Sequence, residues 1–134
     1  METLNRRSDK EIAGGILRIL EGKGIQKTLS RLFPEVIAKI YGPFTAKDEN
    51  SWYVLQIIVV PKKLREEGLA TEYIKEFTRM ARQEKIDIAL TPDASYQSKG
   101  GMSKGKLTQW YKTLGFVKKH KDDFRFMNTY CYYN

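Results

Sequence analysis

The chain has 134 residues but only one cysteine and one histidine. A lone thiol, Cys131, excludes an internal disulfide and a cysteine-rich metal site. The lone imidazole, His120, stands in a lysine-rich run typical of a solvated turn, so we expect neither a histidine-based triad nor a metal site with several imidazoles. No apolar run approaches the roughly 18 residues that span a bilayer. The polar N-terminus lacks a signal-peptide core, and we therefore expect a cytoplasmic protein without a membrane segment.

Neither repeats, low-complexity tracts nor linker-like stretches divide the chain. Hydrophobic residues make up 41% and charged residues 30% of the sequence, which is the composition of a globular protein and not of a disordered one. A chain of this length can bury one core. We therefore predict a single domain over residues 1–134.

Positive charge is concentrated in the last third of the chain. The net charge is +8. Residues 94–134 hold 8 Lys and Arg against 2 Asp and Glu, a net of +6, whereas residues 1–93 hold 16 against 14, a net of +2. A cationic face attracts polyanions such as nucleic acid, an acidic protein or the phosphates of a nucleotide. An ordinary lysine-rich surface explains the same counts, and both interpretations stay open.

Helical patterns dominate the first third of the chain. A capping box at Ser8 and Glu11 opens an apolar stripe that two glycines end. Apolar residues at helical spacing continue over residues 25–40, where Pro34 is expected to kink or restart the helix because it lacks an amide donor. We predict a helical N-terminal part over residues 1–50.

The clearest strand covers residues 51–60, an almost unbroken run of β-branched, aromatic and aliphatic side chains. Such a run predicts a strand that is buried on both faces and therefore central in a sheet. An amphipathic helix over residues 67–83 and a short apolar strand over residues 86–90 follow. Strand, helix and strand in this order predict a βαβ-like unit.

Residues 91–105 form a polar loop, rich in glycine and serine, before the last helix. Ser103 is placed to cap that helix, and Gly115 is the expected left-handed residue after its end. Alternating aromatic residues beyond it predict a terminal hairpin of residues 116–117 with residues 124–133.

A candidate anion site lies where the strand of residues 51–60 leads into the next helix. The first turn of that helix presents unpaired amides with partial positive charge. Gly68 and Ala70 are small where a phosphate would press on the backbone. A plain strand–loop–helix connection is the alternative, and Glu66 and Glu67 favour it because acidic groups repel a phosphate.

A second informative segment is the last helix, where Tyr111 follows Trp110 and a glycine stands four residues later. An aromatic stripe at helical spacing usually belongs to a core. A buried tyrosine still requires a partner for its hydroxyl. The aromatic pair alone therefore does not separate a packing role from a functional one.

Taken together, the two segments resemble the GNAT superfamily of N-acetyltransferases. The matching motifs are Arg65-x-x-Gly68-x-Ala70 and Trp110-Tyr111-x-x-x-Gly115-Phe116. Their order along the chain and the distance between them also match the family. The resemblance covers about residues 51–134. The Thr91-Pro92 pair and its polar loop also look like a short form encoded by bacteriophages. The resemblance implies an α/β (α+β) fold, a central mixed β-sheet flanked by helices, here preceded by the helical N-terminal part.

The resemblance also implies acetyl-CoA as co-substrate and direct attack of an amine on the thioester, without a protein nucleophile. The positions implied for cofactor binding are Ile58, Val59 and Val60 for the pantetheine arm, and Arg65, Glu66, Glu67, Gly68, Leu69 and Ala70 for the pyrophosphate. Tyr111 would protonate the departing CoA thiolate, where negative charge develops. Asp93 is the best-placed acid for a general base, although an aspartate after proline more often shapes a turn.

The acceptor is the part that the resemblance informs least, because the family begins with strands where this sequence predicts helix. A polyamine, a lysine, a nucleobase amine and an aminoglycoside stay open as acceptors. The alternative function is a non-catalytic GNAT-like module that binds nucleic acid or a protein through residues 94–134. The oligomeric state also stays open, a homodimer included.

Overall fold

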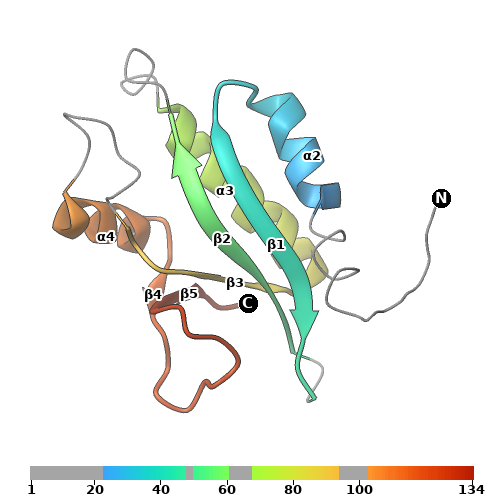
Figure 1. Ribbon diagram of the computed structural model, residues 1–134, viewed down its shortest axis with the longest axis vertical. Helices are drawn as coiled ribbons and strands as arrows, with labels where there is room; N and C mark the ends of the chain where they lie inside the picture. The colour runs from blue at the N-terminus through green and yellow to red at the C-terminus, as the bar shows by residue number, and fades with distance from the viewer. Residues whose placement is uncertain (1–22, 48–49, 61–67, 94–102) are drawn as a thin grey trace.

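The computed structural model describes residues 23–47, 50–60, 68–93 and 103–134. Within these ranges the chain forms three helices and a five-stranded sheet (Figure 1). The helices are α2 (Lys23–Leu32), α3 (Leu69–Glu84) and α4 (Lys104–Thr113). The strands are β1 (Ile37–Thr45), β2 (Ser51–Val59), β3 (Asp87–Leu90), β4 (Val117–Lys118) and β5 (Tyr130–Tyr132).

The sheet has the strand order β1-β2-β3-β5-β4. β2 and β3 run parallel and are connected through α3, whereas the other neighbouring pairs are antiparallel. β3 lies inside the sheet, and its residues Ile88 and Ala89 are fully buried. This arrangement confirms the predicted strand–helix–strand unit and a mixed sheet with helices packed against it.

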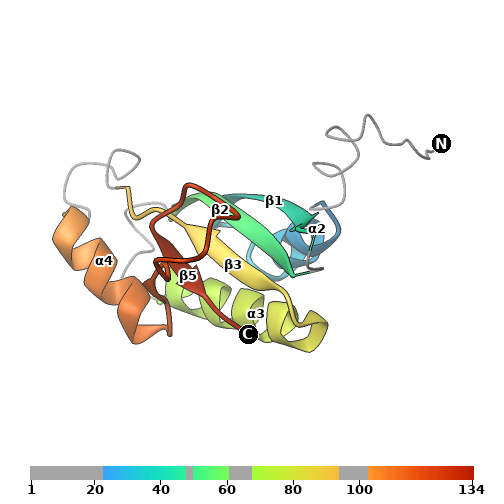
Figure 2. The same cartoon turned by 90° about the horizontal axis from the view of Figure 1, so that it is seen from below.

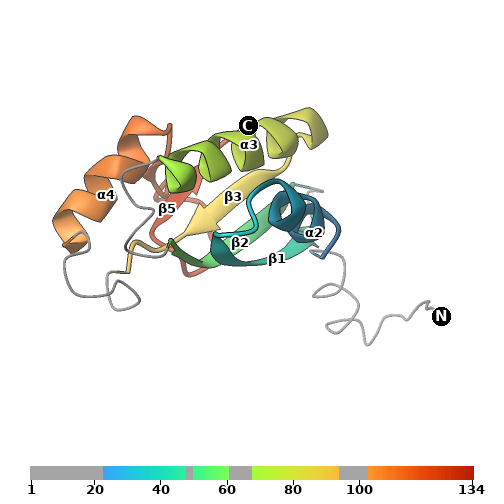
Figure 3. The ribbon, with the colours of Figure 1, turned by 90° about the horizontal axis from the view of Figure 1, so that it is seen from above.

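α2 and α3 cover one face of the sheet, and residues 119–129 cross the opposite face (Figures 2 and 3). The main core lies between the two helices and the sheet, and its largest fully buried side chains include Leu29, Tyr73, Ile74, Phe77, Ile88 and Leu90. Burial of one such side chain stabilises a fold by roughly 1.5–3 kcal/mol. A smaller cluster on the opposite face joins Ala89, Phe126 and Cys131.

The helix predicted over residues 25–40 is wrong in its second half. α2 ends before Pro34, and the chain then forms β1, which pairs antiparallel with β2. The apolar positions that suggested one stripe belong to two elements, since Leu29 is fully buried on α2 and Ile40 is 3% exposed on β1. The N-terminal part is therefore not wholly helical. The helix predicted to start at the capping box, near residues 8–22, lies outside the described residues.

The strand predicted over residues 51–60 corresponds to β2, and its interior position in the sheet is confirmed. The prediction that both of its faces are buried is wrong. Tyr53 and Leu55 are buried on the face that α3 covers, whereas Gln56 is exposed and Val54 is half-buried. The face opposite the helices is therefore only partly covered.

The predicted signals at both ends of α4 are confirmed. Ser103 caps the helix, because its Oγ accepts a hydrogen bond from the Lys106 amide at 3.3 Å. Gly115 follows the helix with a φ of 101°. A Cβ at this glycine would lie 2.8 Å from the Tyr132 ring, so both the backbone conformation and the close approach require glycine.

The predicted terminal hairpin is shorter than expected. β4 pairs antiparallel with β5, but only Val117 and Lys118 on one side and Tyr130 and Cys131 on the other are in register. The intervening residues form a loop, and the expected alternation of side chains is replaced by another pattern. Phe126 is buried, whereas Phe124 is 87% and Met127 is 93% exposed.

Arg125 holds this loop against β2 and β3. Its Nη2 donates to Asp87 Oδ2 at 2.8 Å and to Asp123 Oδ2 at 2.9 Å, and its guanidinium lies 5.5 Å from the centre of the Trp52 ring. The three charged side chains are at most 14% exposed. Removal of one partner from such a buried network leaves an uncompensated charge, so the network fixes the position of the loop.

The Asp123 carboxylate should make the stability of the protein depend on pH under acidic conditions. Its hydrogen bond to Arg125 lowers the pKa of Asp123 from 3.8 to about 2. Because the folded pKa is depressed, this stabilisation is complete above about pH 4 and is lost as the pH falls toward 2. We expect Asp123→Asn to lower the free energy of unfolding at neutral pH by on the order of 2 kcal/mol.

Urea unfolding between pH 2 and 7 measures this effect. The matched control is Asp122→Asn, because Asp122 is the exposed neighbour in the same turn. The control should keep both the stability and its acid dependence. Equal acid dependence in the wild type and Asp123→Asn would contradict the assignment.

Candidate functional site

The parallel strands β2 and β3 are paired over only part of their length. Their register extends from Trp52 opposite Asp87 to Leu55 opposite Leu90. β2 continues beyond this point to its end, and no described strand pairs with it there on the β3 side. Figure 1 shows the two strands diverging, with the start of α3 beside the end of β2 and α4 beyond the end of β3.

A β-bulge lies at the point of divergence. Ile40 of β1 is opposite Leu55, but its neighbour Lys39 is opposite Ile57, so Gln56 is the extra residue on β2. A bulge interrupts the ladder, bends the strand and is common beside functional sites. The side chain of Gln56 is exposed. The bulge therefore brings a polar side chain to the place where the paired part of the two strands ends.

The predicted anion site lies at the first turn of α3. Gly68 precedes the helix with a φ of 72°, and no side chain caps the helix. A Cβ built on Gly68 would meet no described atom within 4 Å. Leu69 and Ala70 are half-buried against the core. The other predicted pyrophosphate contacts, Arg65, Glu66 and Glu67, lie outside the described residues.

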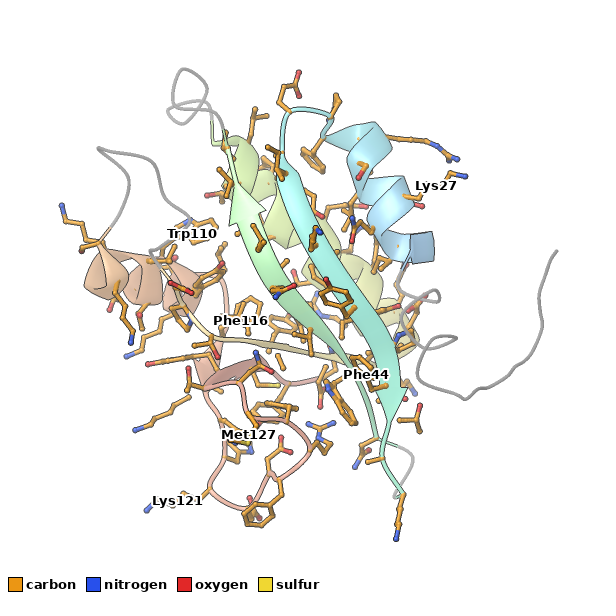
Figure 4. The ribbon with its side chains drawn as sticks, viewed as in Figure 1. Lys27, Phe44, Trp110, Phe116, Lys121 and Met127 are labelled. Atoms are coloured by element: carbon orange, nitrogen blue, oxygen red, sulfur yellow. The ribbon has the colours of Figure 1, made fainter. Side chains whose placement is uncertain are left out.

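The structure brings the two motif segments together. Nε1 of Trp110 on α4 donates a hydrogen bond of 3.0 Å to Oγ1 of Thr71, which lies in the first turn of α3. Figure 4 shows Trp110 on the side of α4 that is turned toward the sheet. The helix that carries the aromatic motif is thus anchored directly at the candidate anion site.

Tyr111 is part of the core and is 5% exposed. Its ring packs edge-on against Phe116 with the ring centres 5.6 Å apart. Burial raises the pKa of Tyr111 above its usual value of 10, so the hydroxyl stays protonated at neutral pH. A protonated phenol is suited to donate a proton.

A pocket of about 450 Å³ lies beside the bulge, on the partly covered face of the sheet. Its lining residues come from β1, from β2, from the chain after β3 and from the loop before β5, and they are Tyr41, Val54, Leu55, Gln56, Thr91, Asp93 and Asn128. Thr91 Oγ1 accepts a hydrogen bond from the Thr129 amide at 3.2 Å, which fixes Asn128 at its edge. Among the described residues that line this pocket, Asp93 is the charged one.

The structure thus places the predicted site residues in three groups. Asp93 lies in the pocket, Tyr111 lies in the core outside the pocket lining, and Gly68 lies at the start of α3. Ile58 and Val59 pair with β1 on one side of β2.

Sequence reasoning gave Tyr41, Gln56, Thr91 and Asn128 no role in a site. Gln56 alone had a local signal, because it is the polar residue inside an otherwise apolar strand.

The lysines of the C-terminal third do not line the pocket in the described part of the chain. They lie instead on the exposed side of α4 and around β4, as with Lys104, Lys112 and Lys118. Figure 4 shows Lys121 pointing away from the protein at the end of the loop. The described basic residues of the C-terminal third therefore lie outside the lining of this pocket.

Among the described residues, no cluster of three or more His, Cys, Asp or Glu side chains is arranged to hold a metal ion. None of the helices in these ranges has the length and apolar character that crossing a bilayer requires. No family model, curated protein or solved structure matches the chain. The function must therefore be argued from the geometry of the site.

Proposed function

We propose that the protein is an acetyl-CoA-dependent N-acetyltransferase of the GNAT type. The observation that carries the proposal is the divergence of β2 from β3 beyond Leu55, beside the uncapped first turn of α3. An extended ligand with amide groups can pair with an unpaired strand edge in the manner of an added strand. The pantetheine arm of CoA has this chemistry, and Ile58 and Val59 lie on the edge in question.

The start of α3 supplies the complementary site for the pyrophosphate. First-turn amides of a helix attract phosphate through unpaired N–H groups and the helix dipole. Gly68 leaves space for the phosphate to approach, because a Cβ there meets no described atom. The strand edge and the helix terminus together bind the two chemically distinct halves of one cofactor arm.

The reaction that this arrangement supports is direct acyl transfer. The nitrogen of a neutral amine attacks the thioester carbonyl carbon, a C–N bond forms, and the C–S bond breaks. The amine nitrogen loses one proton to water or to Asp93, and the departing sulfur gains one from Tyr111, which is protonated at neutral pH. The products are an acetamide and the free thiol of CoA, so no oxidant, reductant or covalent enzyme intermediate is needed.

We expect acetyl-CoA to stabilise the full chain against heat. At 100 times its Kd the ligand adds about 2.7 kcal/mol to the free energy of unfolding, which corresponds to a melting temperature higher by several degrees. S-acetylpantetheine, which lacks the pyrophosphate, should give a clearly smaller shift at the same concentration. Thiol release with a panel of amines then tests turnover. No melting shift with acetyl-CoA would contradict the proposal.

A second function is favoured by a separate observation, the exposed Phe124 and Met127 in the loop that also carries the exposed Lys121. Aromatic and cationic side chains together are typical of surfaces that bind single-stranded nucleic acid. In this alternative the protein is a non-catalytic module. Binding of an oligonucleotide that weakens steeply with salt, without any response to acetyl-CoA, would favour the alternative.

A further inference from the structure

Among the described residues that line it, the pocket beside the Gln56 bulge carries a charge opposite to that of the protein as a whole. The chain carries a net charge of +8, yet Asp93 is the charged side chain among the described lining residues. The C-terminal third, with its excess of lysines, contributes Asn128, which is neutral. A polyanion is therefore attracted to other parts of the surface, whereas a small cation finds a compatible charge at this place.

The other lining groups have the chemistry of an ammonium site. Gln56, Thr91 and Asn128 provide amide and hydroxyl oxygens that accept hydrogen bonds from an N–H group. Tyr41 adds an aromatic ring, and the face of such a ring attracts ammonium groups. The volume of about 450 Å³ lies within the range of pockets that hold small molecules.

We infer that this pocket binds a small alkylamine as its ammonium form through Asp93, and that this amine is the acetyl acceptor, its nitrogen attacking the thioester after the ammonium has lost one proton to water. The binding of the amine is argued from the pocket alone, whereas its role as acetyl acceptor rests on the proposed function. The location supports the link, because Leu55 and Gln56 line the pocket and also mark the end of the β2–β3 pairing. An amine held there lies next to the strand edge proposed for the acyl carrier. The inference removes nucleic acid from the acceptors that the sequence left open.

The test uses diaminopentane as the probe and the full chain without acetyl-CoA. We expect the diamine to bind in calorimetry and to shift the side-chain amide resonances of Gln56 and Asn128. Pentanediol has the same length but no charge and should not bind. Asp93→Asn should weaken binding of the diamine by about fivefold, the upper value for a single exposed charge pair. Asp122→Asn, which removes an exposed acid outside the pocket lining, should leave the affinity unchanged.

Each result tests either the cation site or the role of the amine as acetyl acceptor. Absence of diamine binding, equal affinity for the diol, or unchanged affinity in Asp93→Asn would overturn the cation site. Displacement of the diamine by oligothymidylate would overturn it as well. If the diamine binds as expected but acetyl-CoA does not, the cation site stands and the proposed function fails. If both bind and no acetylated diamine forms, the assignment of the amine as acceptor is wrong.

Discussion

Gly68→Asp is expected to weaken CoA binding by about a hundredfold or more while the fold remains intact. The new carboxylate stands at the first turn of α3, where the pyrophosphate is proposed to bind. Two like charges about 4 Å apart repel by about 4 kcal/mol at the effective dielectric of a protein surface, and 1.4 kcal/mol is a factor of ten in affinity. Among the described atoms none lies within 4 Å of a Cβ built at this position, so the substitution meets no clash with them.

Gly68→Asn is the matched control for this variant. Both substitutions force a side chain onto a residue with a φ of 72°, which costs roughly 1–2 kcal/mol for most residues and less for Asn and Asp. The two variants share this backbone cost and nearly the same shape, so they differ mainly in charge. Calorimetry should find the asparagine variant much closer to the wild type, and thermal melts should show similar stability for both. If the aspartate variant keeps normal affinity, the pyrophosphate binds elsewhere.

Local patterns in the sequence were sufficient to predict the helix and strands around the proposed anion site. The apolar run of β2, the stripe of α3 and the short strand β3 each carry their own signal, because burial dictates the spacing of apolar residues within one element. The ends of α4 were also predictable. Ser103 and Gly115 act through hydrogen bonds and backbone angles that involve only nearby residues.

The boundary between α2 and β1 could not be predicted in the same way. Residues 25–40 have apolar side chains at spacings that suit a helix throughout. Pairing with β2 decides the outcome, because Ile37 and Ile40 gain a strand partner that a local window does not contain. The backbone amide of Ile40 on β1 donates a hydrogen bond of 2.7 Å to Oε1 of Gln26 on α2, and this bond links the helix to the strand that follows it. Tertiary pairing here overrides helical periodicity.

The pocket is even harder to predict from the sequence than the boundary between α2 and β1. Tyr41, Gln56, Thr91 and Asn128 come from four separate stretches, and only the strand registers bring them together. The bulge at Gln56 is an irregularity of pairing, so it has no sequence signature of its own. Arg125, which fixes the loop that carries Asn128, is paired with an aspartate 38 residues earlier in the chain. Prediction of such a site requires the topology first.

Tyr111→Phe is expected to lower turnover by roughly 10²–10⁴-fold, the usual contribution of general acid catalysis. Phenylalanine keeps the ring that packs against Phe116 and removes only the hydroxyl. Loss of one hydroxyl should change the free energy of unfolding by no more than about 1 kcal/mol, the usual contribution of one hydrogen bond. CoA affinity should stay near the wild-type value. Steady-state thiol release and thermal melts on the same preparation measure both effects.

Tyr73→Phe is the matched control for a buried tyrosine without a catalytic role. Tyr73 lies on α3, is 1% exposed, and has a buried hydroxyl without a partner in the described part of the chain. Burial raises its pKa to about 12, so its chemical state resembles that of Tyr111. The same substitution at Tyr73 should leave turnover unchanged. Equal losses in the two variants would indicate a general effect on packing.

The pH dependence of turnover gives an independent test of the same assignment. Because burial raises the pKa of Tyr111 above 10, its acid form persists through neutral and moderately alkaline conditions. A general acid of this kind should cause no decline of kcat between about pH 7 and 10, whereas an acid with an ordinary imidazole pKa would lose activity there. A kcat of Tyr111→Phe equal to that of the wild type would contradict the assignment. The thiolate would then be protonated by solvent, and Tyr111 would have only a packing role in the core.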